Sequence, residues 1–273
     1  MSVTTRIQEL NNRLATNLVN KGVSAEGTET TTELINKVND IETGGTSVIN
    51  PEWTDWRYFS YYNNRNELVA KLKYSDTSSG TNFGSMFSSC SNLTTIPQID
   101  TSSGTNFGNM FYYCSNLTTI PQLDTSKGTN FGSMFYYCSK LTTIPQLNTS
   151  SGTSFSNMFD HCSNLTEIPQ LDTSSGTNFS TMFYYCSNLT NLTMTGTIKA
   201  NGMDLHYSTK LSKASIISVI NALSDTTNAL KVQLSKIAVN NAFETSSGVA
   251  DGSTSEEWTT LIATKANWTI ALS

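Results

Sequence analysis

Paired residues that could do chemistry recur at one place in a 24-residue repeat. Each pair directly follows a phenylalanine, and the candidates for a ligand site are Tyr112, Tyr113, Tyr136, Tyr137, Asp160, His161, Tyr184 and Tyr185. Tyrosine offers contact area and a hydrogen-bonding tip at a low cost in side-chain entropy, which suits recognition of a glycan or a protein. On a helix, the first residue of each pair lies about 100° from the preceding buried phenylalanine and faces away from the core. If the repeats stack, we expect these tyrosines to form an exposed ladder. The alternative is that the tyrosines only pack on one another along the stack.

Asp160 and His161 replace the tyrosine pair in one repeat and are the one place where a catalytic acid and base could arise. Glycan cleavage needs a pair of carboxylates, and the other recurring acids are single aspartates, one in each repeat. No third catalytic partner accompanies Asp160 and His161. We therefore expect a protein that is not an enzyme and has no cofactor.

Two further residue types recur at the repeat period. The five cysteines fall at intervals of 24 residues, as Cys90, Cys114, Cys138, Cys162 and Cys186. We expect them to form a column of buried, reduced thiols, because a metal site would need clustered ligands and the chain has only two histidines. The turn residues are Asp100, Asp124, Asn148 and Asp172. They are expected to cap backbone amides, with a bound cation such as calcium as the alternative.

The repeat that positions these residues divides into two halves. Leu117, Ile120 and Leu123 recur at intervals of three, which suits a short extended rung. The second half places Phe107, Met110, Phe111 and Cys114 at i, i+3, i+4 and i+7, the spacing of one face of a short helix. Because a fixed period of this length is typical of stacked repeats, we predict an α/β solenoid. It is a leucine-rich-repeat-like stack of 24-residue coils, each made of a strand, a turn and a short helix.

The pattern predicts four regions. Residues 1–44 form an N-terminal helical attachment or oligomerisation segment, with helices over about 4–21 and 31–41, and residues 45–75 form an aromatic N-terminal cap. The repeats occupy residues 76–195, and residues 196–273 form a C-terminal cap of degenerate repeats. Within that cap we expect a helix from Ser212, a rung over 230–234, a helix opened by Thr254 or Ser255, and a rung over 268–272.

Composition excludes several classes of function. The formal net charge is −5 and only 14% of the residues are charged, whereas a nucleic-acid surface is basic. No run of apolar residues is long enough for a transmembrane helix. The first residues are polar and lack the apolar core of a secretion signal, so we expect no export by a cleaved signal and no membrane insertion.

The string M-F-x-x-C-S-x-L-T-x-I-P-x-L-D-T-S-x-G-T begins at Met86 and resembles the BspA-like leucine-rich repeat family over about residues 76–195. This resemblance implies an adhesive surface protein without known catalysis. The Asn-Val that often follows Asp-Thr-Ser in this family is Ser-Gly or Lys-Gly here. The ending, from Leu205 to Thr269, is similar to the tails that close such repeats in bacterial and phage proteins. The opening, with Ile7-Gln8-Glu9-Leu10 and Leu34-Ile35-Asn36-Lys37-Val38, is similar to the beginnings of phage tail and minor structural proteins.

These resemblances favour a phage virion protein, a fibre or tail-associated component whose repeats recognise a host cell-surface glycan or protein. Residues 1–44 would join it to other virion proteins or to further copies in a homo-oligomer. A bacterial surface adhesin exported by another route and a virion spacer that binds nothing are the alternatives.

Overall fold

The structure is a computed structural model that describes residues 69, 72, 76–225, 229–243 and 255–273. The predicted helices over 4–21 and 31–41 and almost all of the predicted aromatic cap lie outside the described residues. Of the stretch before residue 76, Val69 and Leu72 are described, and both are buried.

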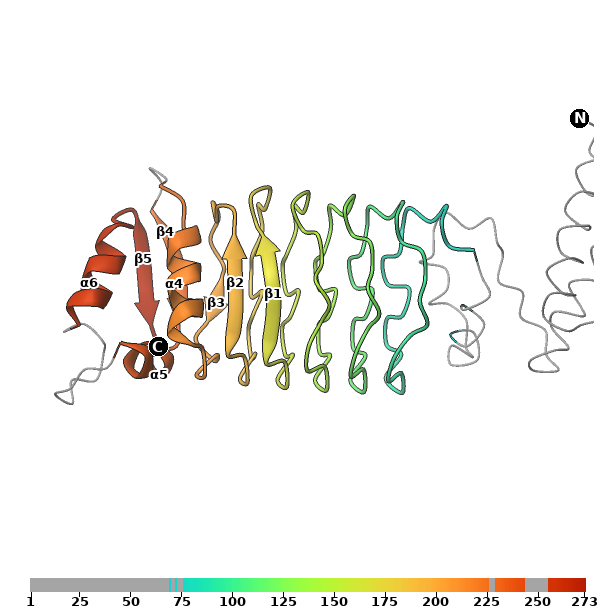
Figure 1. The fold of residues 1–273 in the computed structure, drawn as a ribbon, viewed down its shortest axis with the longest axis horizontal. Helices are drawn as coiled ribbons and strands as arrows, with labels where there is room; N and C mark the ends of the chain where they lie inside the picture. Colours follow the sequence, from blue (N-terminus) through green and yellow to red (C-terminus); the bar gives the residue numbers. More distant parts are fainter. Residues whose placement is uncertain (1–68, 70–71, 73–75, 226–228, 244–254) are drawn as a thin grey trace, which may run out of the picture. The chain divides into compact units, whose positions relative to one another are not determined.

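The 24-residue units follow one another as coils of a repeat stack (Figure 1). Backbone N–H groups of alternate residues donate to carbonyl oxygens of the next coil, as from Phe107 to Asn130 and from Phe111 to Met134, both at 2.9 Å. This alternation is the bonding pattern of a parallel sheet. The rungs regular enough to be strands are β1, Glu167–Asp172, and β2, Asn191–Thr195, which pair in parallel. The predicted rung positions Leu117, Ile120 and Leu123 are buried.

The predicted short helix in the second half of each coil is wrong. Two successive turns occupy this segment, with the N–H of Met110 donating to the carbonyl of Phe107 and that of Cys114 to Phe111. The third residue of each turn has a positive φ, 57° at both Asn109 and Tyr113, which is the feature of type II turns. In a helix, all N–H groups of this segment would bond carbonyls of the same segment. Here the N–H groups of alternate residues bond carbonyls of the next coil instead.

The core of the stack consists of columns of identical side chains. Two columns of phenylalanine rings run along it, with neighbouring centroids 5.4–5.9 Å apart and planes within 11° of parallel. The five cysteines form the predicted column of buried, reduced thiols. The Sγ atoms of Cys114, Cys138 and Cys186 each donate to a phenylalanine carbonyl of the preceding coil at 3.1 Å. Burial raises the pKa of the Cys138 and Cys186 thiols well above 9.0, so they stay protonated.

Polar columns join the coils at their surface. The hydroxyl of the buried Thr125 donates to the carbonyl of Asn148 at 2.8 Å, and the side-chain amide of Gln146 donates to the carbonyl of Gln170 at 2.6 Å. Asn130 donates from its side-chain amide to the Asn106 side chain at 2.9 Å. Each of these bonds joins neighbouring coils. Because the same polar residue recurs at each position, the bonds stabilise the stack along its length.

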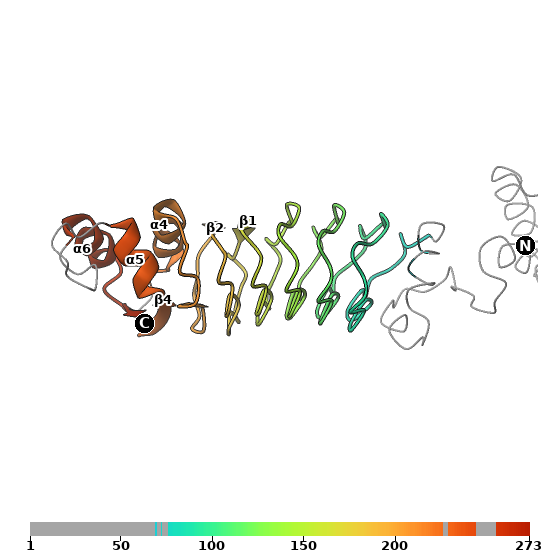
Figure 2. The ribbon, with the colours of Figure 1, turned by 90° about the horizontal axis from the view of Figure 1, so that it is seen from below.

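The C-terminal region contains helices and short strands. The elements are β3 Asp204–Leu205, α4 Lys213–Ala222, β4 Leu230–Leu234, α5 Lys236–Ala242, α6 Glu256–Ala263 and β5 Trp268–Leu272. Figure 2 shows the helices α4, α5 and α6 from below. The predicted helices and rungs appear as α4, β4, α6 and β5, with Ser212 and Ser255 as the N-caps of the helices. Helix α5 was not predicted. Strand β4 pairs with both β3 and β5 in parallel.

Helix α4 closes the sheet edge at β2. The hydroxyl oxygen of Ser215 accepts the N–H of Leu192 at 2.9 Å, and that of Ser218 accepts the N–H of Met194 at 2.8 Å. These N–H groups would otherwise bond another coil. Because a sheet edge with unpaired backbone groups invites further strands, the two serines end the β1–β2 sheet and satisfy these two N–H groups at its edge.

Candidate functional site

Side chains of the recurring pairs form a surface feature that we call the aromatic ladder, made of two columns. The outer column holds the second residue of each pair and consists of Tyr113, Tyr137, His161, Tyr185 and Tyr207. Its neighbouring ring centroids lie 3.9–4.7 Å apart, with planes 6–27° from parallel. The inner column holds the first residue of each pair and consists of Tyr112, Tyr136, Asp160, Tyr184 and His206. Tyr112 and Tyr136 stack at 4.9 Å.

Backbone bonds between coils set this ring spacing. The N–H of Tyr113 donates to the carbonyl of Tyr136 at 2.8 Å, and the N–H of His161 donates to the carbonyl of Tyr184 at 2.8 Å. Tyr137 is bonded in the same way to Asp160, at 2.9 Å, so these three outer residues are each joined to the inner residue of the next coil. Because coils joined in this way keep the spacing of neighbouring strands, about 4.8 Å, equivalent rings meet face to face.

The outer column stands on unfavourable backbone. Tyr113, Tyr137, His161 and Tyr185 have φ angles between 55° and 60°, a left-handed conformation that is a genuine outlier for bulky residues. It costs about 1–2 kcal/mol for a residue with a Cβ atom. Ring stacking returns about 0.5–1.5 kcal/mol for each pair. The two effects are similar in size, so an aromatic residue here gives little net stability over asparagine or glycine.

Two aspartates hold the two histidines of the ladder. The Nδ1 atom of His161 lies 2.5 Å from Oδ1 of Asp160, and Nδ1 of His206 lies 2.6 Å from Oδ1 of Asp204. The Asp160 side chain is 8% exposed and that of His161 is 28% exposed, so the carboxylate lies beneath the imidazole. Tyr184 lies between the two histidines, with ring centroids 6.0 Å from His161 and 5.6 Å from His206.

Burial controls ionisation in the ladder. It raises the pKa of the Asp160 carboxyl, and the hydrogen bond and charge of His161 oppose this shift. Burial, followed by the negative charge of Asp160, raises the pKa of Tyr136 to about 12. The Tyr136 hydroxyl therefore remains a hydrogen-bond donor at neutral pH.

All eight predicted site residues belong to the ladder, but their exposure differs from the expectation. We expected the first residue of each pair to face away from the core. In the structure the second residue is the more exposed in the pairs at 112–113, 160–161 and 184–185, at 40% for Tyr113 and 37% for Tyr185, whereas Asp160 is buried. The reason is that turns, not a helix, carry the pairs. The tyrosines do pack on one another, and the outer column also remains open to solvent.

Sequence reasoning missed His206 and Tyr207, which continue the ladder by one coil. Tyr207 stacks on Tyr185 at 3.9 Å, and the interaction between their hydroxyls raises the pKa of Tyr185. The signal was Leu205-His206-Tyr207-Ser208, which repeats the order of Phe183-Tyr184-Tyr185-Cys186. Its spacing is 22 residues instead of 24, so a search at a fixed period passes over it.

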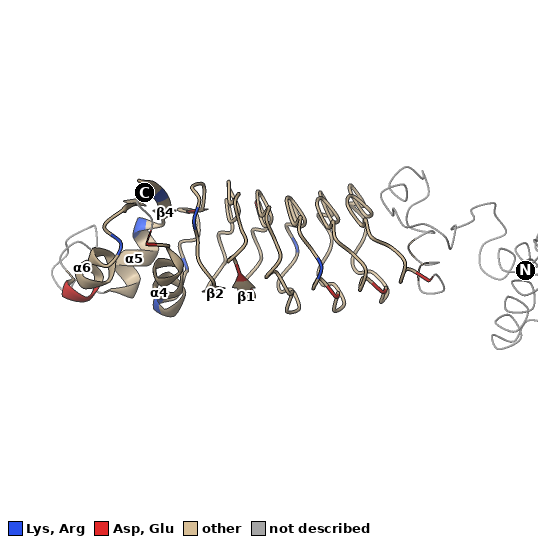
Figure 3. Ribbon diagram, turned by 90° about the horizontal axis from the view of Figure 1, so that it is seen from above, with Lys and Arg blue, Asp and Glu red and all other residues tan. Residues whose placement is uncertain are grey.

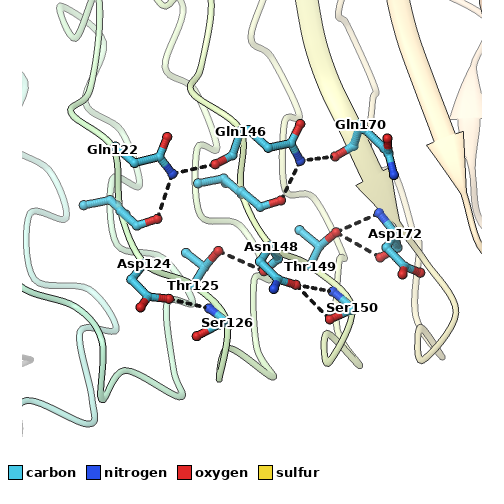
Figure 4. A pocket seen from close by; sticks show the side chains of 12 residues that line it. Gln122, Asp124, Thr125, Ser126, Gln146, Asn148, Thr149, Ser150, Gln170 and Asp172 are labelled. Carbon is cyan, nitrogen blue, oxygen red and sulfur yellow. Dashed lines mark hydrogen bonds between the residues drawn. The ribbon is translucent and has the colours of Figure 1, made fainter.

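The turn aspartates act as predicted caps. Oδ1 of Asp124 accepts the N–H of Ser126 at 2.9 Å, and the equivalent bond from Ser174 to Asp172 is also 2.9 Å. Hydrogen bonds from Ser126 lower the pKa of Asp124. A shallow polar pocket lies over these turns and the neighbouring glutamines (Figure 4). Among the described residues, no three His, Cys, Asp or Glu side chains gather closely enough to hold a metal ion.

Charged residues are sparse along the repeat stack, as Figure 3 shows. In the part of the chain that the structure describes, no helix has the length and apolar character to cross a membrane.

Comparison with known proteins gives one match. The family model DUF285, described as a Mycoplasma protein of unknown function, matches residues 57–143 and again residues 116–215. This match is compatible with the BspA-like resemblance of the repeats. No curated protein and no solved structure matches the chain. The two matched stretches together span more than half of the chain and cover the coils that carry the ladder, so the chain belongs to the DUF285 family.

Proposed function

We propose that this protein recognises a cell surface through the aromatic ladder, which a leucine-rich-repeat-like solenoid displays. The observation that carries the proposal is the outer column. Its five rings stack without a break, at 3.9–4.7 Å, and four of them stand on left-handed backbone. Stability alone does not explain tyrosine in the outer column, because the strained backbone offsets the ring stacking. Presentation of aromatic rings to a ligand does explain it.

We place this recognition protein on a phage virion, as a fibre or tail-associated component. The support is the similarity of residues 7–38 to the beginnings of phage tail and minor structural proteins, and of the chain's ending to tails that close such repeats in bacterial and phage proteins. In this role residues 1–44 attach the chain to other virion proteins or to further copies of itself, and the ligand is a glycan or protein of the host surface. A bacterial surface adhesin is the second candidate, favoured by the BspA-like character of the repeats.

The test of recognition is adsorption to a panel of bacterial cells. The panel includes Mycoplasma species, because the family description names them. The variant Tyr113→Asn/Tyr137→Asn/Tyr185→Asn, which removes three rings of the outer column, is expected to lose binding, whereas Gln146→Ala, in the polar pocket away from the ladder, should bind normally. Equal binding by all three proteins would refute the proposal.

Location is tested separately. Mass spectrometry of purified phage particles, and labelling of those particles with an antibody against the repeat stack, should find the protein on an exposed fibre or tail. Its absence from particles and presence on a bacterial surface would replace the virion by the adhesin.

A further inference from the structure

The outer column of the ladder offers ring edges to a ligand, and not ring faces. Both faces of Tyr137, His161 and Tyr185 are covered by the neighbouring rings, at centroid distances of 3.9–4.7 Å. A ligand therefore cannot insert between these rings. It must lie across their edges and polar tips, along the direction in which the coils stack. A ligand that fits this surface is long and narrow.

The polar atoms of the ladder are suited to alcohol groups. Tyrosine hydroxyls both donate and accept hydrogen bonds. The carboxylates of Asp160 and Asp204 engage Nδ1 of His161 and His206. This leaves Nε2 of each imidazole to bond a ligand, as an acceptor when the ring is neutral and as a donor when it is protonated. The two histidines are 28% and 19% exposed, so solvent reaches these rings. Tyr184 between them completes a cluster of donors and acceptors.

The charge of the ladder disfavours an anionic ligand. It contains no lysine or arginine, and the negative groups at its inner side are Asp160 and Asp204. Phosphate, sulfate and carboxylate groups are bound by arginine, lysine or clustered N–H groups, none of which the ladder side chains supply. A chain of uncharged sugars carries hydroxyl groups in a regular row and brings no charge.

We propose that the aromatic ladder binds a linear, uncharged polysaccharide laid along the stack, with the Asp160–His161 and Asp204–His206 pairs around Tyr184 as its most polar subsite. This inference rests on the proposed recognition function and names its ligand class. The arrangement makes affinity depend on ligand length, because each further sugar reaches the ring of a further coil.

The first experiment measures binding of the full chain to the cell panel after chemical treatment of the cells. Periodate, which cleaves vicinal diols, should reduce binding at least about tenfold, equivalent to about 1.4 kcal/mol, and protease treatment should leave it unchanged. Binding that depends on the ladder but resists periodate and is lost with protease would overturn the polysaccharide and leave the recognition function. Binding that no ladder variant alters on any cell would overturn both.

The second experiment tests the axial arrangement with polysaccharide released from the bound cells and fractionated by length. Longer fragments should compete better than short ones until the fragment spans the ladder. The variant Ser88→Tyr/Ser89→Tyr extends the ladder by one coil, since Ser88 and Ser89 occupy the equivalent positions in the coil before Tyr112, and should raise the length at which competition levels off. Equal competition by short and long fragments would refute the axial arrangement.

The third experiment tests the polar subsite. In Asp160→Asn/His161→Phe a ring remains stacked between Tyr137 and Tyr185, but the imidazole nitrogens are gone, and binding should weaken about tenfold. The variant Asp160→Tyr/His161→Tyr introduces the tyrosine pair that neighbouring coils carry at these positions, so we expect it to fold normally. It should weaken binding by a similar factor. Gln146→Ala is the control. Unchanged binding by both ladder variants would remove the Asp160–His161 pair from the site.

Discussion

The imidazole of His161 lies between the rings of Tyr137 and Tyr185, at 4.1 Å and 4.6 Å, while its Nδ1 atom contacts Asp160 at 2.5 Å. One residue thus belongs both to the stacked outer column and to a hydrogen-bonded pair that reaches the buried side of the ladder. The imidazole of His161, in the most polar part of the ladder, is therefore held both by ring stacking and by its contact with Asp160.

Asp160 should give the protein a distinctive pH dependence. Burial raises the pKa of its carboxyl above 3.8, so the folded state holds the proton more tightly than the unfolded state. Its contribution to the free energy of unfolding then falls as pH rises from about 4 through the raised pKa. Asp160→Asn lacks this loss, so melting temperatures of the variant and the wild type should diverge in the variant's favour with rising pH. A difference that stays constant between acid and neutral pH would contradict the assignment.

Tyr137→Asn should separate stability from binding. At a φ of 58°, asparagine is tolerated better than tyrosine, and this relief of about 1–2 kcal/mol offsets the loss of two stacked contacts of about 0.5–1.5 kcal/mol each. Chemical denaturation should find an unfolding free energy within about 1 kcal/mol of wild type, while cell binding is lost. Tyr137→Leu keeps the strained backbone and loses the stacking, so it should be clearly less stable than Tyr137→Asn.

Ser208 should be a site of easy stabilisation. It is fully buried where the column of cysteines would continue, and its hydroxyl has no hydrogen-bond partner among the described residues. Such a hydroxyl costs about 1–3 kcal/mol, so Ser208→Cys should raise the free energy of unfolding by about 1 kcal/mol. The reverse change, Cys186→Ser, should lower it. Stabilisation by both substitutions, or by neither, would show that the column ends before Ser208.

Ser215→Ala should weaken the end of the stack. The change removes the acceptor of the Leu192 N–H, which lies in a buried position, and an unsatisfied buried donor costs about 1–3 kcal/mol. Denaturant titration should show this loss. Amide exchange should locate it, with faster exchange at Leu192. Asn221→Ala, on the exposed side of α4, is the matched control and should leave both measurements unchanged.

The sequence predicted the parts of the fold that depend on repetition. The period places each buried leucine, phenylalanine and cysteine, because identical coils must bury identical positions. It did not predict the path of the chain from Phe107 to Cys114, since spacing at i, i+3, i+4 and i+7 suits both a helix and two successive turns. What decides between them is that N–H groups such as those of Asn109 and Tyr113 bond the next coil, a long-range contact that local spacing does not contain.

The candidate site was predicted by residue type and only partly by geometry. The recurrence of the tyrosine pairs predicted a ladder. Which member of each pair is exposed depends on the positive φ at Tyr113 and its equivalents, which the recurrence does not reveal. His206 and Tyr207 were missed because the last coil is shorter and has serine in place of cysteine. The pairing of Asp204 with His206 depends on side-chain directions that two residues of separation do not specify.

Each coil presents the same pattern of donors and acceptors to the coil before it, and the complementary pattern to the coil after it, so any coil can follow any other. A duplication or deletion of one 24-residue segment therefore preserves every bond across the junction and changes only how many rings stand in the row. Recombination between the near-identical repeats of the gene would yield variants with longer or shorter ladders in a single event. The length of the ladder, and with it the length of ligand that the ladder can contact, can in this way change by one coil at a time without any new type of contact between coils.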